Sequence, residues 1–276
     1  MDILEAVILG LIQGLAEFLP ISSSGHLAIA MAAMGIEEEP LLLAVLFHLG
    51  TLVAVLVVFW RDWWEMLKNP FKSKALWLLV LATLPAAMLG VLLSSRISEI
   101  FAAAWFVGLF FLLTSALLLV AEHFAKHPVP TGRHARKSDI HDVGVKHALA
   151  MGAMQGVALF PGLSRSGSTI VGGMLSGLNR ATATKFSFMM SAPIILGSTI
   201  FEARDLFKAE GGISNALSGG WLAPLIGILV AGVSGYFAIR WMLKLVQRVS
   251  LRWFALYTGV LGVLVLLDHF VFGLLL

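Results

Sequence analysis

The sequence predicts an all-α integral membrane protein, built as an inverted-topology repeat of six transmembrane helices plus two re-entrant helix-loop-helix hairpins. The first supporting observation is composition: 59% of the 276 residues are hydrophobic and 13% are charged, against about 25% charged residues in soluble domains. The second is spacing, because short polar islands separate apolar stretches of about 20 residues, the length of a helix that crosses a bilayer. The third is an internal duplication. The chain has no cysteine, which excludes disulfides, thiolate metal sites and cysteine nucleophiles.

Two apolar regions are interrupted near the middle by polar residues. Region 3–36 contains the sequence PISSSGH, and region 147–178 contains PGLSRSGST. Backbone that leaves the helix at membrane depth is tolerated only where protein or water covers it. Each region is therefore predicted to be a re-entrant hairpin. The remaining apolar stretches predict spanning helices near 41–60, 75–95, 101–121, 186–203, 221–240 and 253–275.

The two interrupted regions are similar to each other. At a constant offset of 142 residues, seven of the thirteen positions in 13–25 are identical to their counterparts in 155–167. Identities that fall on the loops predict an internal duplication. Each half has one hairpin followed by three spans, and an odd number of spans inverts the second half. The predicted units are a first repeat 1–122, a cytoplasmic linker 123–146 and an inverted second repeat 147–276.

The distribution of Lys and Arg agrees with this topology. Fifteen of them fall on one predicted side of the membrane, and only Arg96, Arg204 and Lys208 fall on the other. The positive-inside rule assigns the rich side to the cytoplasm, which puts both termini outside the inner (plasma) membrane. The two broken loops are then expected to meet inside the bilayer. The net charge of +3 gives no reason to expect nucleic acid as a partner, whereas membrane lipid is an expected one.

Both loops place hydroxyl groups and a glycine directly before a predicted helix. The unpaired backbone N–H groups and the positive dipole end of a helix N-terminus attract an anion, and Ser and Gly let it come close. Two such ends at one place predict an anion site. Its candidate residues are Ser22, Ser24, Gly25, Ser164, Ser166 and Gly167.

Charged and reactive side chains lie beside these loops. The planar guanidinium of Arg165 suits phosphate oxygens, and its position in a membrane segment is costly without such a partner. Gln13 and Glu17 are four residues apart and share one helix face, where Glu17 could hold a divalent cation or act as a base. His26 follows Ser23 closely enough to exchange a proton with it. These side chains are therefore predicted to bring an acid, a hydroxyl, a base and a guanidinium to one place.

The motifs resemble the undecaprenyl-diphosphatase family of the bacitracin-resistance type. The similarity rests on QGLAEFLPISSSGH at 13–26 and PGLSRSGST at 161–169, and the span pattern extends it over essentially the whole chain. It implies hydrolysis of the terminal phosphate of undecaprenyl diphosphate, which recycles the lipid that carries cell-wall sugars. It also implies a divalent cation (Mg²⁺ or Ca²⁺), a site open to the outer face, and a place for Thr169 in that site. The sequence departs from some members at Gln13, where they carry glutamate.

The charges suggest a mechanism and leave alternatives. Arg165 and a cation held with Glu17 would neutralise the transferring phosphoryl group, while Ser23 or a water attacks and His26 carries the proton. The main alternative is a transporter or flippase of an isoprenyl phosphate or a small anion, because broken helices and midplane anion sites are typical of secondary transporters. A protein that binds diphosphate without catalysis is another. His48 is expected to be a hydrogen-bonded packing residue, and a homodimer is left open.

Overall fold

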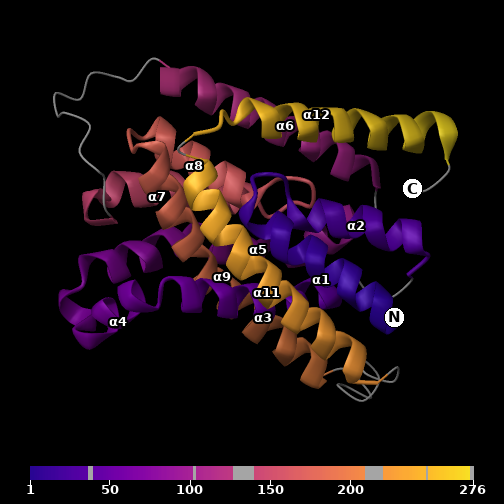
Figure 1. The fold of residues 1–276 in the computed structure, drawn as a ribbon, viewed down its shortest axis with the longest axis horizontal. Coiled ribbons are helices and arrows are strands. Elements are labelled where there is room, and N and C mark those ends of the chain that lie inside the picture. The colour runs from indigo at the N-terminus through magenta and orange to yellow at the C-terminus, as the bar shows by residue number, and fades with distance from the viewer. Residues whose placement is uncertain (37–39, 102–103, 127–139, 209–219, 247, 274–276) are drawn as a thin grey trace.

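The computed structural model describes residues 1–36, 40–101, 104–126, 140–208, 220–246 and 248–273 (Figure 1). Every regular element in these ranges is helical, which confirms the all-α prediction. The long helices are α1 (Ile3–Phe18), α2 (Ser23–Met34), α3 (Pro40–Val58), α4 (Trp60–Lys68), α5 (Lys74–Phe101), α6 (Ala104–Lys126), α7 (Val145–Val157), α8 (Arg165–Leu175), α9 (Arg180–Lys208), α11 (Leu222–Leu245) and α12 (Arg252–Leu267). Short helical turns are η1 (Pro70–Lys72), η2 (Ile140–Asp142) and η3 (Asp268–Phe272).

Several of these helices are long and apolar enough to cross a membrane. Within the described residues, five such segments lie in α5, α6, α9, α11 and the α12–η3 region. The segment Leu46–Val58 of α3 passes the same test together with α4, although the chain bends by 75° between them. These regions coincide with the six predicted spans and identify a multi-pass membrane protein.

Several element ends differ from the predicted ones; α5 continues to Phe101 instead of ending near 95, and α11 continues to Leu245 instead of ending near 240. Helix α9 begins at Arg180 instead of near 186, because the side chain of Asn179 accepts a hydrogen bond from Thr182 N at 2.9 Å and caps the helix there. Helix α6 continues to Lys126, so it enters the predicted linker 123–146. Most of that linker, residues 127–139, lies outside the described residues.

The predicted interruptions of the two apolar regions are present. The first separates α1 from α2 at residues 19–22, and the second separates α7 from α8 at residues 158–164. Both breaks end in the same kind of N-cap: Ser22 Oγ accepts from Gly25 N at 3.4 Å, and Ser164 Oγ accepts from Gly167 N at 3.0 Å. Cap hydroxyls of this kind satisfy backbone N–H groups that the helix itself leaves unpaired.

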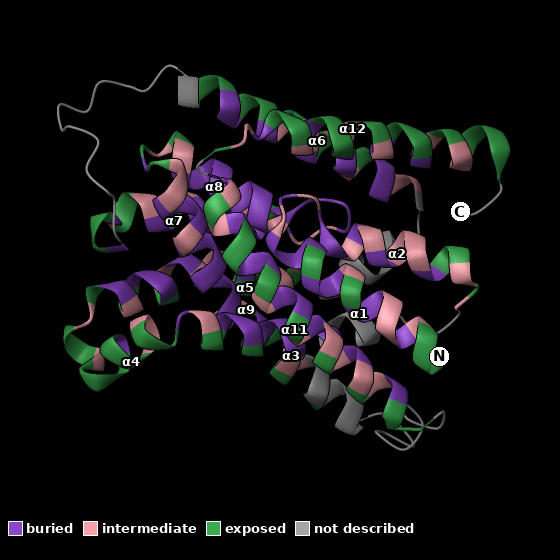
Figure 2. Cartoon of the chain, viewed as in Figure 1, coloured by how far each residue is buried: buried purple, intermediate pink, exposed green. Residues whose placement is uncertain are grey.

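Helix α8 lies in the centre of the molecule. All residues from Ser166 to Gly173 are buried, on every face of the helix, and Figure 2 shows α8 and its surroundings as the most continuously buried region. Helices α6, α7 and α9 pack around it. A Cβ atom at Gly172 would lie 2.9 Å from the carbonyl oxygen of Ala150, so α7 and α8 approach closely because this position has no side chain. The central position of α8 sets the place of the second loop.

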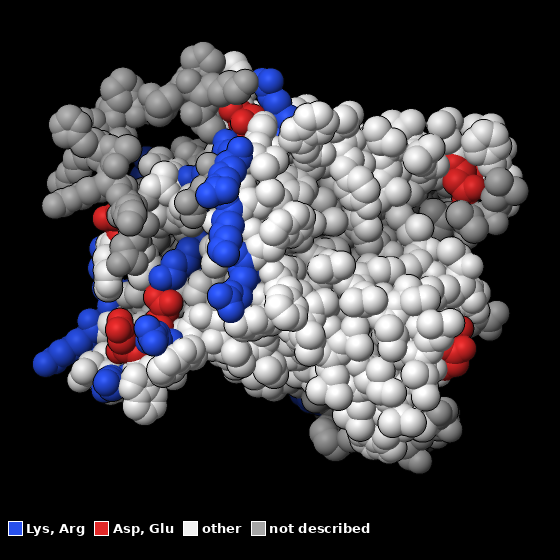
Figure 3. All heavy atoms as spheres, in the orientation of Figure 1, with Lys and Arg blue, Asp and Glu red and all other residues white. Residues whose placement is uncertain are grey.

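Charged residues are distributed unevenly over the molecule. On the face drawn in Figure 3, most Lys and Arg gather at the end where α4 and α7 lie. At this end Lys185 Nζ pairs with Asp62 at 2.7 Å, and Arg180 Nη2 pairs with the buried Glu122 at 2.7 Å. The polar end is therefore also tied together by ion pairs between α4, α6 and α9.

Candidate active site

The two broken regions are in direct contact. Ser166 Oγ, at the start of α8, donates a hydrogen bond to the carbonyl oxygen of Leu19 at 2.8 Å. On the other side, Thr114 of α6 donates to the carbonyl oxygen of Gly162 and accepts from Ser164 N, both at 3.0 Å. The loops that the sequence predicted to meet are thus joined to each other and fixed to α6.

Glu17, at the end of α1, is the centre of the polar cluster between these loops. Its side chain is buried, with 5% of the residue exposed. Arg165 Nη2 donates to Glu17 Oε1. The other carboxylate oxygen, Oε2, accepts from Gln13 Nε2 at 3.0 Å and from Ser23 Oγ at 2.6 Å. A buried carboxylate needs such donors, since an unpaired one would be strongly disfavoured.

His48 of α3 also contacts this carboxylate. Its Nε2 lies 3.2 Å from Glu17 Oε2. The sequence suggested a packing residue at this position, and the structure instead places its imidazole in the site. The sequence signal that could have identified His48 is that it is an ionisable residue within a spanning helix. The distance between His48 and Glu17 in the sequence does not indicate that they are in contact.

Ser23 lies at the first position of α2, directly beside Glu17. Its hydroxyl is nearly buried and directs its proton to the carboxylate. The preceding residue, Ser22, has a φ of 70°, and it is the one described residue other than glycine with a positive φ. This left-handed conformation costs about 1–3 kcal/mol for such a residue and is typical of functional sites. The strained turn sets the direction in which Ser23 leaves the loop.

His26 lies one turn further along α2, and both of its ring nitrogens have partners. Nδ1 is 2.6 Å from the carbonyl oxygen of Ser22, and Nε2 is 2.6 Å from the hydroxyl of Tyr257 on α12. In this arrangement Ser23 donates its hydrogen bond to Glu17, while His26 contacts other groups. Tyr257 was not singled out from the sequence, where an isolated tyrosine in an apolar helix has no distinguishing pattern.

The remaining predicted residues line the two helix starts. Their hydroxyls bond within the protein: Ser22 Oγ lies 3.3 Å from Ser24 Oγ, and Ser164 Oγ lies 3.3 Å from Ser166 Oγ. Thr169 Oγ1 lies 2.6 Å from Ser187 Oγ of α9. These residues therefore shape the two helix starts.

Several buried polar atoms near the loops have no hydrogen-bond partner among the described residues. They are Gln13 Oε1, Arg165 Nη1, Ser168 Oγ and both amide atoms of Gln155. Buried polar atoms are rarely left unpaired in proteins. The donors in this set, Arg165 Nη1 foremost, suit the oxygens of a phosphate group.

The donor set also bears on the divalent cation that the family resemblance implies. Among the described residues, no group of three or more His, Cys, Asp or Glu side chains could hold a metal ion. Mg²⁺ is commonly held by one or two protein oxygens together with substrate phosphates and water. Glu17 and the unpaired Gln13 Oε1 fit that second kind of site, in which the substrate supplies most of the ligands.

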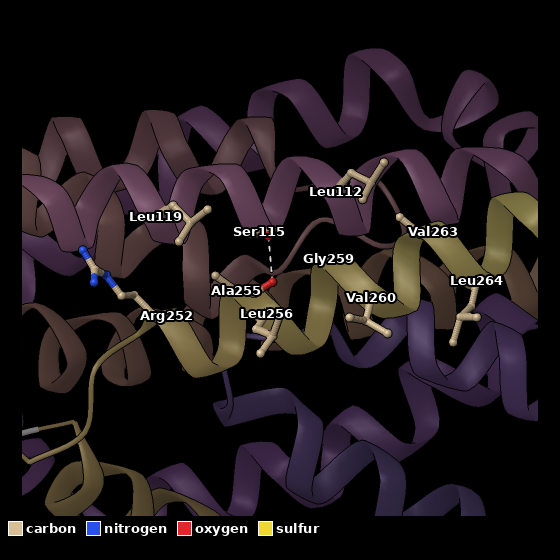
Figure 4. Close-up of a pocket in the computed structure, with 10 residues that line it drawn as sticks. All are labelled: Leu112, Ser115, Leu119, Arg252, Ala255, Leu256, Gly259, Val260, Val263 and Leu264. Carbon is tan, nitrogen blue, oxygen red and sulfur yellow. Dashed lines mark hydrogen bonds between the residues drawn. The ribbon is translucent and has the colours of Figure 1, made fainter.

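A separate groove is lined by residues of α6 and α12 (Figure 4). It has a volume of about 530 Å³, and its walls are almost entirely apolar. Arg252 lies at one end, and Ser115 Oγ donates to the carbonyl oxygen of Ala255 at 2.7 Å within it. None of the predicted site residues lines this groove, so it is not the reaction site.

Comparisons with known proteins agree with the motifs. The family model described as "Bacitracin resistance protein BacA" matches residues 6–264. The chain belongs to the BacA family. Among its relatives in the family, an "Undecaprenyl-diphosphatase" from Halothermothrix orenii is 35% identical over 270 residues, covering 97% of this chain and 98% of the relative. A protein of the same name from Methanobrevibacter smithii is 37% identical over 289 residues, with 97% and 98% covered. "Undecaprenyl-diphosphatase 4" from Bacillus thuringiensis subsp. konkukian is 39% identical over 272 residues, with 98% of each chain covered.

Proposed function

We propose that this protein hydrolyses undecaprenyl diphosphate, or a similar polyprenyl diphosphate, to the monophosphate and inorganic phosphate. The reaction would recycle the lipid carrier for cell-wall synthesis. Relatives named undecaprenyl-diphosphatase, which match over nearly the full chain, support this function. The structural observation that carries it is the hydroxyl of Ser23, which donates to the buried Glu17 at 2.6 Å while Arg165 pairs with the other oxygen of the same carboxylate.

The first step follows from these contacts. Ser23 Oγ attacks the terminal phosphorus, a new Oγ–P bond forms, and the bond between this phosphorus and the bridging oxygen breaks. The proton of Ser23 goes to Glu17 Oε2, and the polyprenyl monophosphate leaves. As Glu17 becomes neutral, Arg165 is free to pair with the negative charge on the phosphoryl oxygens. The N-terminal ends of α2 and α8 add backbone N–H donors to the same charge.

The second step returns the enzyme to its starting state. A water attacks the phosphoserine, a new O–P bond forms, and the bond between Ser23 Oγ and phosphorus breaks. Ser23 recovers its proton from Glu17, and His26 takes the proton of the water. We assign the second proton transfer to His26, and not the first, because Ser23 donates to Glu17, whereas His26 bonds to Ser22 and Tyr257. His26 gives this proton to the departing phosphate, and inorganic phosphate is released.

A divalent cation, Mg²⁺ or Ca²⁺, is part of this proposal. Before Glu17 takes the proton of Ser23, its carboxylate and Gln13 Oε1 would hold the cation together with the oxygens of the diphosphate. When bound, it would neutralise charge on the substrate phosphates. Because Gln13 is neutral, this helix contributes one carboxylate to the cation and not two.

The topology also belongs to the proposal. We assign the two halves to an inverted repeat with re-entrant hairpins 3–36 and 147–178, both termini outside, and the site open to the outer face. The matching caps at Ser22 and Ser164 support the repeat, and the gathering of Lys and Arg supports the orientation. Since the chain has no cysteine, single cysteines placed at residue 2 and at residue 72 can be labelled with a membrane-impermeant maleimide. Residue 2 should react from outside and residue 72 should not, and the reverse pattern would contradict the orientation.

The deciding experiment measures phosphate release from a polyprenyl diphosphate by the protein purified in detergent. It compares the wild type, the wild type in EDTA, and a Ser23→Ala variant. We expect release that EDTA suppresses and that the substitution reduces by more than a hundredfold. A well-folded wild type that releases no phosphate with any common divalent cation would instead favour transport of an isoprenyl phosphate. Binding of the diphosphate without release or transport would favour a binding protein.

A further inference from the structure

The surroundings of His26 contain a residue with no assigned role. Tyr257 of α12 places its hydroxyl 2.6 Å from His26 Nε2, and the two rings lie nearly parallel, 12° apart with centroids 5.6 Å apart. Phe111 of α6 meets the same imidazole edge-on, at a centroid distance of 5.3 Å. Helices α6 and α12 therefore contact His26 from two sides. His26 and Tyr257 are 231 residues apart in the sequence.

The hydrogen bonds determine which nitrogen of His26 carries the proton. Nδ1 faces the carbonyl oxygen of Ser22 at 2.6 Å, and a carbonyl oxygen can only accept. The proton of the neutral imidazole is therefore on Nδ1, and the lone pair is on Nε2. The partner of Nε2 must then be a donor, and the hydroxyl of Tyr257 is one. The two contacts agree on a single tautomer, which Tyr257 helps to select.

Helix packing explains how Tyr257 reaches this position. Gly262 of α12 and Gly108 of α6 pack against each other, so that a Cβ at Gly262 would lie 2.8 Å from the carbonyl oxygen of Gly108. Ser115 of α6 donates to the carbonyl oxygen of Ala255, two residues before Tyr257. These contacts fix the rotation of α12. Tyr257 itself is 47% exposed, so core packing does not account for the position of its hydroxyl.

We infer that Tyr257 is a positioning residue for His26: its hydroxyl donates to Nε2, which fixes the Nδ1–H tautomer, and the hydroxyl gives that proton to Nε2 as it accepts the proton of the attacking water. The inference rests on the proposed function, in which His26 takes the proton of the attacking water. It predicts that loss of the hydroxyl impairs proton transfer by His26 and leaves substrate binding unchanged. Helix α12 then contributes to the site through a residue that lies in neither loop motif.

A Tyr257→Phe variant tests this directly, because it removes one oxygen from a half-exposed ring. The matched control is Tyr236→Phe, at the other of the two tyrosines in the chain, whose hydroxyl accepts from Arg240 at 2.6 Å. We expect Tyr257→Phe to lower kcat by about tenfold, equal to about 1.4 kcal/mol, with KM changed by less than about twofold. Tyr236→Phe should leave both constants within about twofold of the wild type.

A double-mutant cycle separates a role through His26 from a merely structural one. In a His26→Ala background, Tyr257→Phe should lower kcat by less than about twofold further, because the group that it positions is absent. An undiminished tenfold loss in that background, or a wild-type kcat for Tyr257→Phe alone, would overturn the inference.

A spectroscopic measurement tests the contact when the His26→Ala variant is too slow to assay. The Tyr236→Phe protein has Tyr257 as its single tyrosine, so tyrosine labelled with ¹³C at Cζ gives one NMR resonance. We expect His26→Ala to shift this resonance, and an unchanged resonance would show that the hydroxyl does not bond to His26. Failure of the wild type to release phosphate would contradict the proposed function alone, since the NMR measurement does not depend on activity.

Discussion

Replacing Glu17 by glutamine gives the sharpest test of the proposed first step. The side chain keeps its size but loses its charge and one of its two acceptor oxygens. If the new amide nitrogen faces Arg165, two donors oppose each other. If it faces Gln13 and Ser23, the Gln13 amide can turn its unpaired Oε1 towards it, and the Ser23 hydroxyl can turn to accept. The second orientation preserves packing, but it leaves the proton of Ser23 without an acceptor.

The expected magnitudes follow from this geometry. A general base contributes about 10²–10⁴ in rate, so the Glu17→Gln substitution should lower kcat by at least a hundredfold, or about 2.7 kcal/mol. Removing one partner of a buried ion pair destabilises a protein by about 3–5 kcal/mol. The loss here should be smaller, because the amide oxygen still accepts from Arg165.

The assay is phosphate release at saturating substrate, combined with thermal unfolding followed by tryptophan fluorescence. Glu122→Gln is the matched control: Glu122 is also buried, its Oε2 accepts from Arg180 Nη2 at 2.7 Å and from Leu251 N at 3.1 Å, and it lies outside the cluster of Glu17. Both variants should unfold at lower temperature, but Glu122→Gln should keep kcat within about threefold of the wild type. The reasoning fails if Glu17→Gln keeps more than about a hundredth of kcat, or if the control loses as much activity.

Two further predictions concern the second loop. Arg165→Ala should leave less than about a tenth of the turnover, which is an increase of the barrier by more than about 1.4 kcal/mol. The protein should stay folded, because Glu17 keeps its other donors. Phosphate release measures the first effect, and the unfolding temperature measures the second. Gly162→Ala should destabilise the protein, because φ is 88° and the new Cβ would lie 2.4 Å from the carbonyl oxygen of Val107. Gly177→Ala, where φ is 109° and nothing lies within 4 Å, should lower the unfolding temperature less, and equal losses would mean that the contact with Val107 is unimportant.

Much of the fold was predictable because its determinants are local. Apolar stretches of spanning length predicted the spans, and polar runs before Ser23 and Arg165 predicted the two breaks, since hydropathy and N-cap chemistry operate within a few residues. The start of α9 was missed because the cap at Asn179 precedes the apolar part of the helix, where a hydropathy pattern places no boundary.

The candidate site was predictable only in part, for a physical reason. The sequence by itself determined the membrane class, the two serine-capped helix starts and the family motifs that contain Glu17, Ser23, His26 and Arg165. The tertiary structure alone decided the partners: Glu17 with Ser23, Arg165 and His48, and His26 with Tyr257. Those contacts depend on which faces of distant helices pack together, and an apolar face that meets lipid has the same composition as one that meets protein.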